Sequence, residues 1–317
     1  MENMVRGQKC MKTVVVTGAS GFVGRNLVNY FVDKNIHVYA IVRNPDSDIF
    51  HGNSNVSVLQ YDLSEADKIE KRLRGIRIDA FYHLAWQGAR GSGRSEYLLQ
   101  IENTKYACDM AVVASHLSVL KFIAVGTITE RLADELLENK STAQNLMYGL
   151  TKSYTHKLLN LVCAKEKINL IWAELSNIYG GDDDSGNLIS YTIDCFKNNI
   201  MPTFGPCNNY YDFIHIDDVI RILYELGQNQ EACGFYFVGR CENKILKEYI
   251  EEIGRLYAKE VAIGTRPDDG VRYKKEWFDN RRLTEELKYS FKYSFEEGIK
   301  KEMERGEENV GKNRYKY

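Results

Sequence analysis

The stretch VVVTGASGFVGRNL, residues 14–27, spaces glycines by three directly after an apolar run. The β-branched run predicts a strand, and the apolar spacing after the glycines predicts a helix. Gly18 can take a backbone angle closed to other residues, Gly21 leaves room for a pyrophosphate, and Gly24 lets the helix pack closely on the sheet. Free amides and the helix dipole favour phosphates there. A plain tight turn is the alternative, but the strand before and the helix after favour dinucleotide binding.

The first half of the chain alternates short β-branched runs with longer helical patterns. Strands are expected over 13–18, 37–43, 56–62, 79–85, 120–126 and 169–175. Helices are expected over 25–34, 65–74, 95–115 and 145–165. The strands are apolar almost throughout, which is typical of parallel strands that are covered on both faces. With right-handed crossovers, this alternation predicts an α/β fold built on a doubly wound parallel sheet.

After about residue 177 the chain becomes rich in turns and strands become sparse. We expect a smaller C-terminal lobe at the carboxyl edge of the sheet, where such folds bind ligands. The predicted division is a nucleotide-binding domain over 11–177, to which 212–240 returns, and a substrate lobe formed by 178–211 and 241–308. The ends, 1–10 and 309–317, are expected to be disordered tails.

The composition is that of a soluble globular protein. The 317 residues are 44% hydrophobic and carry a formal net charge of -2, which gives no electrostatic footprint for nucleic acid or an acidic membrane surface. No apolar run approaches the roughly 20 residues of a membrane span, and the start of the chain lacks the apolar core of a secretory signal. The seven cysteines are scattered without a CxxC pair, and the histidines lack metal-ligand spacing. We therefore expect reduced thiols, a cytoplasmic location and no metal site.

Tyr148 and Lys152 lie four residues apart at the start of a helical pattern, which places them on one helix face. A tyrosine with its ordinary pKa of about 10 transfers protons poorly at neutral pH. A neighbouring ammonium favours the phenolate and lowers that pKa. The pair therefore predicts a general acid/base, although a tyrosine and a lysine at this spacing are common on helices.

Taken together, the GxxGxxG turn and the Tyr–Lys pair resemble the extended branch of the short-chain dehydrogenase/reductase family, the NAD(P)-dependent sugar-nucleotide epimerases, dehydratases and 4-ketoreductases. The resemblance extends over YHLAW (82–86), SNIYGG (176–181), GNLI (186–189), YYDFIHIDDV (210–219), RPDD (266–269) and YSFEEGI (293–299). It implies a Rossmann-type fold with a substrate-binding C-terminal lobe. It also implies that Thr127 polarises the reacting oxygen and that Asn103 supports Lys152.

The resemblance implies a set of cofactor contacts. They are Gly18, Ser20, Gly21, Phe22, Val23, Gly24, Arg43, Asp62, Leu63, Leu84, Ala85, Tyr148 and Lys152. Arg43 stands where NAD-binding relatives carry an acidic residue, and its guanidinium suits a 2′-phosphate, which favours NADP(H) over NAD(H). A solvated surface arginine is the alternative. Asp62 resembles the aspartate that contacts adenine, and a helix N-cap is its alternative.

Substrate contacts are implied for Trp86, Asn177, Asn187, Leu188, Tyr211 and Arg266. Three residues depart from the family pattern. Tyr211 replaces an arginine, Glu174 stands where an arginine is frequent, and Trp86 replaces a small alanine beside the cofactor. These departures indicate a less usual nucleotide or sugar, so the nucleotide is left open.

The residues after Thr127 separate the reaction classes. The 4,6-dehydratases resemble TDEVYG, with an Asp–Glu pair after the threonine, whereas Ile128 and Thr129 stand here and argue against dehydration. A preference for NADPH favours reduction of a 4-keto-6-deoxy sugar nucleotide at C4, with Tyr148 as the general acid. A nucleotide-sugar 4-epimerase is the alternative, and a non-catalytic NADP(H)-binding sensor or scaffold is a third.

The helices expected over 95–115 and 145–165 carry apolar residues that one sheet face does not require. In the family that the chain resembles, these helices pair across a dimer axis, which implies a homodimer. Burial of the same residues in a monomer core is the alternative.

Overall fold

The structure is a computed structural model that describes residues 11–44, 50, 52–138, 146–181, 187–268 and 270–313. The strands of the large sheet are β1 (Thr13–Thr17), β2 (His37–Val42), β3 (Val56–Gln60), β4 (Ala80–His83), β5 (Lys121–Thr127), β6 (Asn169–Leu175) and β10 (Gly234–Val238). The helices around it are α1 (Phe22–Asp33), α2 (Ala66–Leu73), α3 (Tyr97–His116), α4 (Thr129–Glu138), α5 (Leu146–Glu166) and α7 (Ile216–Gln228).

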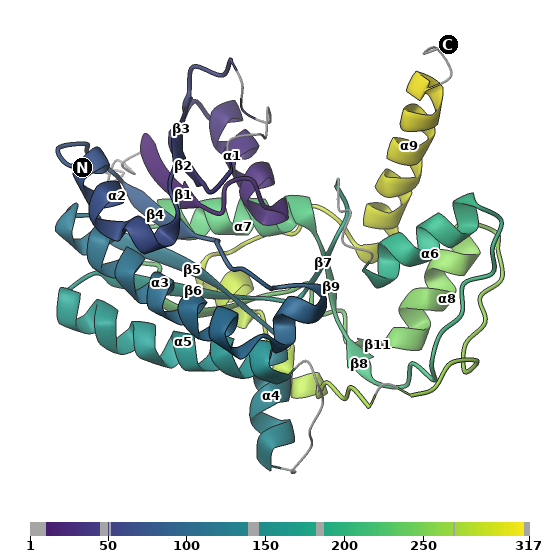
Figure 1. The fold of residues 1–317 in the computed structure, drawn as a ribbon. Helices are drawn as coiled ribbons and strands as arrows, with labels where there is room; N and C mark the ends of the chain where they lie inside the picture. Colours follow the sequence, from purple (N-terminus) through teal and green to yellow (C-terminus); the bar gives the residue numbers. More distant parts are fainter. Residues whose placement is uncertain are drawn as a thin grey trace, which may run out of the picture.

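The large sheet has seven parallel strands in the order β10-β6-β5-β4-β1-β2-β3. Helices α1 and α7 contribute to the core on one face, and α2, α3 and α5 to the core on the other (Figure 1). The strand order reverses direction between β1 and β4, and the carboxyl ends of these two strands meet at the edge where ligands bind in doubly wound folds. The predicted Rossmann-type α/β fold is confirmed.

The turn between β1 and α1 uses its glycines largely as predicted. Gly18 has a φ of +67°, the left-handed region that favours glycine. A Cβ on Gly24 would lie 2.1 Å from Gly18 O, so the first turn of α1 packs directly on the turn before it. Gly21 caps α1, and its N–H donates to Gly18 O at 3.0 Å.

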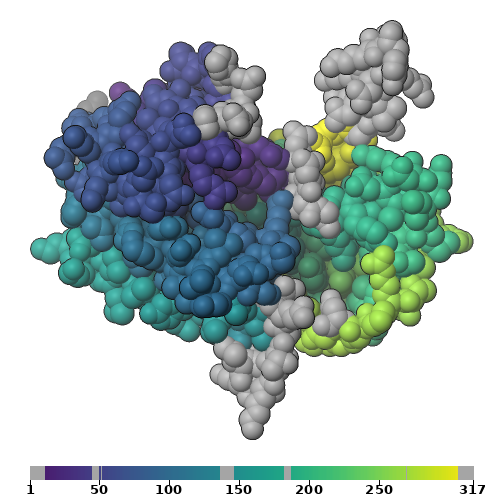
Figure 2. All heavy atoms as spheres, viewed as in Figure 1, coloured from purple at the N-terminus to yellow at the C-terminus, as the bar shows by residue number. Residues whose placement is uncertain are grey.

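The second half of the chain forms a smaller lobe with its own core. It contains β7 (Asn177–Tyr179), β8 (Tyr210–Tyr211), β9 (Phe213–His215), β11 (Lys244–Ile245), α6 (Leu188–Lys197), α8 (Leu246–Leu256) and α9 (Phe295–Asn313). Strand β7 pairs with β9, and β8 pairs with β11. Side chains from α6, α8 and α9 share one apolar cluster. Figure 2 shows the green and yellow-green residues of this lobe gathered on one side of the molecule.

Two features differ from the sequence-based expectation. Helix α4 was not predicted, although TERLADELLE is rich in good helix formers directly after β5. Residues 309–313, expected in a disordered tail, continue α9, a Glu- and Lys-rich stretch with high helix propensity. Residues 1–10 and 314–317 lie outside the described residues, and the domain boundaries remain a prediction.

Candidate active site

A cavity of about 490 Å³ opens at the carboxyl ends of β1, β2 and β4. Among the residues that line it are many of the predicted site residues, namely Gly18, Ser20, Gly21, Arg43, Asp62, Leu63, Leu84, Ala85, Trp86 and Asn103. Phe22, Val23 and Gly24 form the first turn of α1 directly after Gly21. A Cβ on Gly18 would lie 2.6 Å from the Ala85 amide nitrogen, so the two loops approach each other closely only because Gly18 lacks a side chain. This cradle and its helix N-terminus fit a dinucleotide.

Arg43 and Asp62 both line this cavity. Asp62 caps the short helix at 63–65, and its Oδ1 accepts hydrogen bonds from the Ser64 N–H at 2.9 Å and the Ser64 hydroxyl at 2.6 Å. These bonds, helped by the charge of Arg43, hold the pKa of the Asp62 carboxyl below its usual value. The N-cap role of Asp62 is therefore present in the structure, and its contact with adenine stays a prediction.

Tyr148, on the first turn of α5, is buried and forms a hydrogen bond with Thr127 at the end of β5. Burial is the main cause that raises the pKa of Tyr148, to about 12. The charge of Arg94 and the Thr127 hydrogen bond act in the opposite direction. The phenol and the threonine side chain are thus close together, and the phenol is protonated at neutral pH. The catalytic roles of the two residues stay predictions.

Lys152 lies one turn further along α5, and its ammonium contacts groups other than the Tyr148 phenol. Its Nζ donates to Val125 O at 2.7 Å and lies 3.8 Å from the centroid of the Trp86 ring. Burial lowers the pKa of Lys152 to about 7, and the charge of Glu130 partly offsets this effect. We expected Lys152 to lower the pKa of Tyr148. In the structure the cations that lower this pKa are instead Arg94 and, more weakly, Arg90.

Trp86 lines the cavity and also contacts Tyr148 and Lys152, the predicted catalytic pair. Its ring packs edge-on against the Tyr148 ring at a centroid distance of 6.2 Å, and its Nε1 donates to Gln100 Oε1 at 2.9 Å. Asn103 binds the next residue, because its Oδ1 accepts from the Gln87 N–H and its Nδ2 donates to Gln87 O, each at 2.8 Å. Asn103 therefore binds the backbone next to Trp86, whose ring contacts Lys152, and its support of Lys152 stays a prediction.

Buried titratable side chains lie at the end of β5. Glu130 is 4% exposed, and its Oε1 accepts a 2.7 Å hydrogen bond from the Thr127 N–H. Burial raises the pKa of Glu130 to about 8. Glu174, which departs from the family pattern, pairs with Arg131 at 2.7 Å, so α4 supplies a guanidinium to this part of the fold.

Of the predicted substrate residues, Trp86 lines the dinucleotide cavity, and the other five lie in the smaller lobe in two groups. Leu188 and Arg266 line a cavity of about 430 Å³, where Arg266 donates 2.7 Å hydrogen bonds to Thr203 Oγ1 and the Tyr191 hydroxyl. The cavity is further lined by Phe204, Gly205, Pro206, Cys207, Asn209, Leu246, Pro267 and Asp268.

The second group joins strands β7 and β8. The Tyr211 hydroxyl, which replaces the family's arginine, donates to Asn177 Oδ1 at 3.0 Å. Asn187 caps α6 through a 2.9 Å bond from the Ser190 N–H. These two contacts support the local fold, and the substrate roles of these residues stay predictions.

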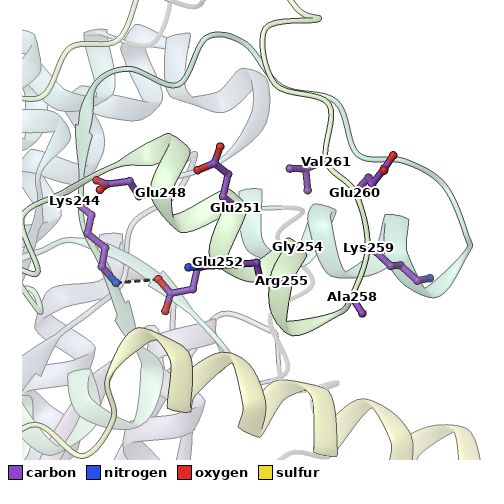
Figure 3. A pocket seen from close by; sticks show the side chains of 10 residues that line it. All are labelled: Lys244, Glu248, Glu251, Glu252, Gly254, Arg255, Ala258, Lys259, Glu260 and Val261. Atoms are coloured by element: carbon purple, nitrogen blue, oxygen red, sulfur yellow. Dashed lines mark hydrogen bonds and ion pairs between the residues drawn. The ribbon is translucent and has the colours of Figure 1, made fainter.

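Another hollow, of about 860 Å³, lies along α8. Figure 3 shows its side chains, which are mostly charged, with Lys244 paired to Glu252 at 2.9 Å. It shares no residue with either cavity that carries predicted site residues. We assign no role to it.

The sequence profile of the NAD dependent epimerase/dehydratase family matches residues 14–239. The chain belongs to this family. A CDP-abequose synthase from Salmonella typhimurium is 24% identical over 249 residues, which cover 75% of this chain and 78% of that protein. An ADP-L-glycero-D-manno-heptose-6-epimerase from Pseudomonas aeruginosa is 21% identical over 254 residues, 74% of this chain and 76% of that protein.

Solved structures of the same type share the fold. The dTDP-glucose 4,6-dehydratase from Streptomyces venezuelae, solved with NAD bound, has a TM-score of 0.76 at 18% identity and covers 94% of this chain and 98% of its own. The UDP-glucose 4-epimerase from Thermotoga maritima, solved with UDP-glucose, has a TM-score of 0.75 at 19% identity and covers 94% and 99%. The protein is therefore an NAD(P)-dependent enzyme of the extended short-chain dehydrogenase/reductase type, as the motifs predicted.

Within this epimerase/dehydratase fold, three contacts with the site escaped the sequence analysis. Arg94 lies over the Tyr148 ring, Gln100 binds the Trp86 indole, and Glu130 binds the Thr127 amide. The motif RGSGRS around Arg94 carries a turn signal but nothing that places it against a helix far along the chain. Among the described residues, no group of three or more His, Cys, Asp or Glu is arranged to hold a metal. Within the described part of the chain, no helix has the length and apolar character needed to cross a bilayer.

Proposed function

We propose that the protein uses NADPH to reduce the C4 ketone of a nucleotide-linked 4-keto-6-deoxy sugar, with Tyr148 as the proton donor. The observation that carries the proposal is the buried Tyr148 phenol, bonded to Thr127 and kept protonated by a pKa raised to about 12. A reduction requires a proton donor at the carbonyl oxygen, whereas the first step of an epimerisation requires the phenolate as a base. The protonated phenol of Tyr148 therefore supports reduction rather than epimerisation.

In this proposal, NADPH supplies the hydride to C4 when it is bound. Tyr148 donates its proton to the oxygen on C4, and the Thr127 hydroxyl hydrogen-bonds the same oxygen as its negative charge develops. We assign Lys152 to the ribose hydroxyls of the cofactor. The ketone becomes a secondary alcohol, and solvent returns the proton to Tyr148.

The two residues after Thr127 argue against a dehydratase. A dehydratase needs carboxyl groups there for proton transfer, but Ile128 is buried in an apolar cluster at 1% exposure. Thr129 follows it and begins α4. Neither side chain can act as a carboxylic acid, so dehydration is set aside.

The choice of cofactor and substrate rests on two arginines. Arg43 lines the cavity on the side of β2, where a guanidinium can bind a 2′-phosphate and so favour NADPH. Arg266 lines the cavity of the smaller lobe, where we expect the substrate diphosphate. The names of two relatives, a CDP-abequose synthase and an ADP-heptose epimerase, support a nucleotide-linked sugar.

A C4 epimerase is the second candidate, because it would use the same Thr127, Tyr148 and Lys152. Several relatives are named epimerases, although these act at C6 of a heptose. The experiment is to mix the purified protein with NADPH and a panel of CDP-, dTDP- and UDP-linked 4-keto-6-deoxy sugars. We expect NADPH absorbance to fall in equal amount to the alcohol formed, and Tyr148→Phe to abolish turnover. Interconversion of C4 epimers without net loss of NADPH would establish the epimerase. Cofactor binding without any turnover would favour a sensor or scaffold.

We also propose that the protein forms a homodimer through α3 and α5. Large apolar side chains on these paired helices are exposed, and they are Tyr97, Leu98, Ile101, Leu150, Tyr154 and Leu161. On α5 they follow a stripe of helical spacing, which is typical of a face that packs on another helix. A cytoplasmic location stays a prediction from the sequence.

A further inference from the structure

The loop between β4 and α3 carries an arginine that the family motifs do not include. The guanidinium carbon of Arg94 lies 4.3 Å from the centroid of the Tyr148 ring. We propose that Arg94 is a positioning residue that fixes the Tyr148 ring and electrostatically stabilises the phenolate form of Tyr148. The proposal rests on the proposed function in one respect, since it takes Tyr148 as the proton donor.

The loop that carries Arg94 is tightly built. A Cβ on Gly88 would lie 2.7 Å from Gly93 O, and a Cβ on Gly93 would lie 2.7 Å from Gly88 Cα. The backbones of Gly88 and Gly93 therefore pack directly against each other, which closes the loop. The fully buried Gln100 locks this contact, because its Nε2 donates to Gly88 O at 3.0 Å and to Gly93 O at 2.8 Å. Arg94 follows the contact directly, so its backbone is fixed relative to α3.

Gln100 couples this loop to the other cation of the site. Its Oε1 accepts the 2.9 Å hydrogen bond from the indole of Trp86, the ring on which the Lys152 ammonium lies. One buried amide therefore orders both the partner of Lys152 and the loop of Arg94. Such a fully bonded buried amide is costly to disturb, so the geometry around it is well defined.

The contacts of Arg94 leave its charge available to Tyr148. Its Nη1 donates to Ala89 O at 3.2 Å, and its buried Nε is without a hydrogen-bond partner in the part of the chain that the structure describes. A buried donor without a partner is unfavourable, because the hydrogen bond it made to water is not replaced. A guanidinium that lies over an aromatic face recovers part of that cost through the ring's quadrupole. No carboxylate is paired with Arg94 among the described ion pairs, so its positive charge is not neutralised locally.

Charged groups from several elements act on Tyr148. Arg94 and Arg90 of the loop lower the pKa of its phenol, Arg94 the more strongly, and Glu130 of α4 raises it. Thr127 of β5 lowers it through its hydrogen bond. Lys152, on the same helix, points its Nζ to Val125 O and the indole of Trp86. Arg94 is thus the cation best placed to stabilise the phenolate left after proton donation.

The test replaces Tyr148 with a difluorotyrosine, whose ring fluorines bring the phenol pKa into the range where the protein stays folded, and follows its ionisation by fluorine NMR. The titration is recorded in otherwise wild-type protein and with Arg94→Met or Arg94→Lys. We expect Arg94→Met to raise the ionisation midpoint by about one pH unit, because an opposite charge at this distance is lost. Arg94→Lys should keep the midpoint close to that of the wild type.

Lys105→Met is the matched control, because Lys105 lies on α3, is exposed and pairs with Asp109. It removes one positive charge near the site without contacting Tyr148, so its midpoint should not move. Equal midpoints in Arg94→Met and wild type would overturn the proposal. So would an equal rise in Arg94→Met and Arg94→Lys, because that result would assign the effect to packing rather than charge.

The titration needs neither cofactor nor substrate, so it separates this inference from the proposed function. A shifted midpoint in a protein that reduces none of the 4-keto sugars would uphold Arg94 and reject the reductase. An unshifted midpoint in a protein that does reduce a 4-keto sugar would reject the role of Arg94 and uphold the proposed function. Circular dichroism at the titration temperature checks that each variant is folded, and Arg94→Gln, which also removes the charge, replaces Arg94→Met in the titration if Arg94→Met is unfolded.

Discussion

The Lys152 ammonium lies 3.8 Å from the centroid of the Trp86 ring, where the family pattern has a small alanine. A cation over a desolvated indole face gains about 2 kcal/mol. The same ring lines the dinucleotide cavity and packs edge-on against Tyr148. Trp86 is thus placed to hold Lys152 in its buried position and to form part of the wall against which a nicotinamide ribose would lie.

We therefore expect Trp86→Ala to raise the KM for NADPH about tenfold, which corresponds to about 1.4 kcal/mol of lost binding. Trp86→Phe keeps a ring and should have a smaller effect. Intrinsic fluorescence gives a direct readout, because NADPH bound beside Trp86 quenches its indole. The quench should largely vanish in Trp86→Phe and persist in Trp277→Phe, whose indole lies in the C-terminal half. A quench that is unchanged in Trp86→Phe would contradict this placement.

The close approach of Gly24 to the preceding turn predicts a large and specific cost of adding one methyl group. A Cβ on Gly24 would meet Gly18 O at 2.1 Å, and backbone cannot move away as a flexible side chain can. We expect Gly24→Ala to lower the free energy of unfolding by about 3 kcal/mol or more in urea denaturation. Gly52→Ala is the control, since Gly52 has a φ of +78° but a Cβ added there would meet no atom within 4 Å. That control should cost about 1–2 kcal/mol.

The fold was predictable because its signals are local. The alternation of apolar strands and helices and the glycine turn each depend on residues that are neighbours in sequence, and the strands were located to within one or two residues. The β10 strand joins the same sheet beside β6, within the segment expected to return to the first domain. Helix α4 was missed because it follows β5 without a turn residue or a proline to mark its start.

The candidate site was predictable only where motif residues carry it. Thr127 and Tyr148 do meet, but the partner of Lys152 is the indole of Trp86 and the guanidinium nearest Tyr148 is Arg94. Those contacts depend on how the loop after β4 closes on itself, which is set by Gln100 on a different element. No sequence pattern predicts that the side chain of Gln100, on α3, binds the backbone of Gly88 and Gly93. Tertiary packing, rather than local pattern, decides such contacts.

Arg43 gives a prediction about cofactor preference. Arg43 lines the cavity together with Ser20 and Asp62, and charge-assisted hydrogen bonds to a phosphate are worth about 1.5–3 kcal/mol. We expect Arg43→Ser to lower the ratio of kcat/KM for NADPH over NADH at least about tenfold, with little change for NADH. Arg72→Ser, on the exposed face of α2, should leave the ratio unchanged. An equal loss for both cofactors would show that Arg43 does not contact the 2′-phosphate.

The buried carboxyl of Glu130 predicts how stability depends on pH. Burial raises its pKa from 4.5 to about 8, so between these values the folded state holds a proton that the unfolded state has lost. Stability from this group is complete below the unfolded pKa and is lost as the pH rises toward the folded pKa. Glu174, with a pKa raised to about 7, acts in the same direction. The urea midpoint should therefore fall between about pH 5 and pH 7.

Below pH 7, Lys152 is charged in both the folded and the unfolded state, so it adds little to this slope. Glu130→Gln removes one of the titrating carboxyls and should show a visibly smaller fall over the same range. Glu251→Gln, an exposed surface change on α8, should keep the wild-type slope. A slope in Glu130→Gln equal to that of the wild type would mean that Glu130 is ionised throughout.

The apolar stripe on α5 predicts which substitution separates the subunits of the proposed dimer. Leu161 is 70% exposed and shares its helix face with Leu150 and Tyr154, so a charge there would be desolvated if two copies of the helix pair met. We expect Leu161→Glu to convert the protein to a monomer in sedimentation velocity while its thermal unfolding as a monomer stays cooperative. Leu120→Glu is the control, because Leu120 is 76% exposed but lies just before β5, outside both helices. A wild-type chain that sediments as a monomer would leave the stripe without a partner copy and reject the dimer.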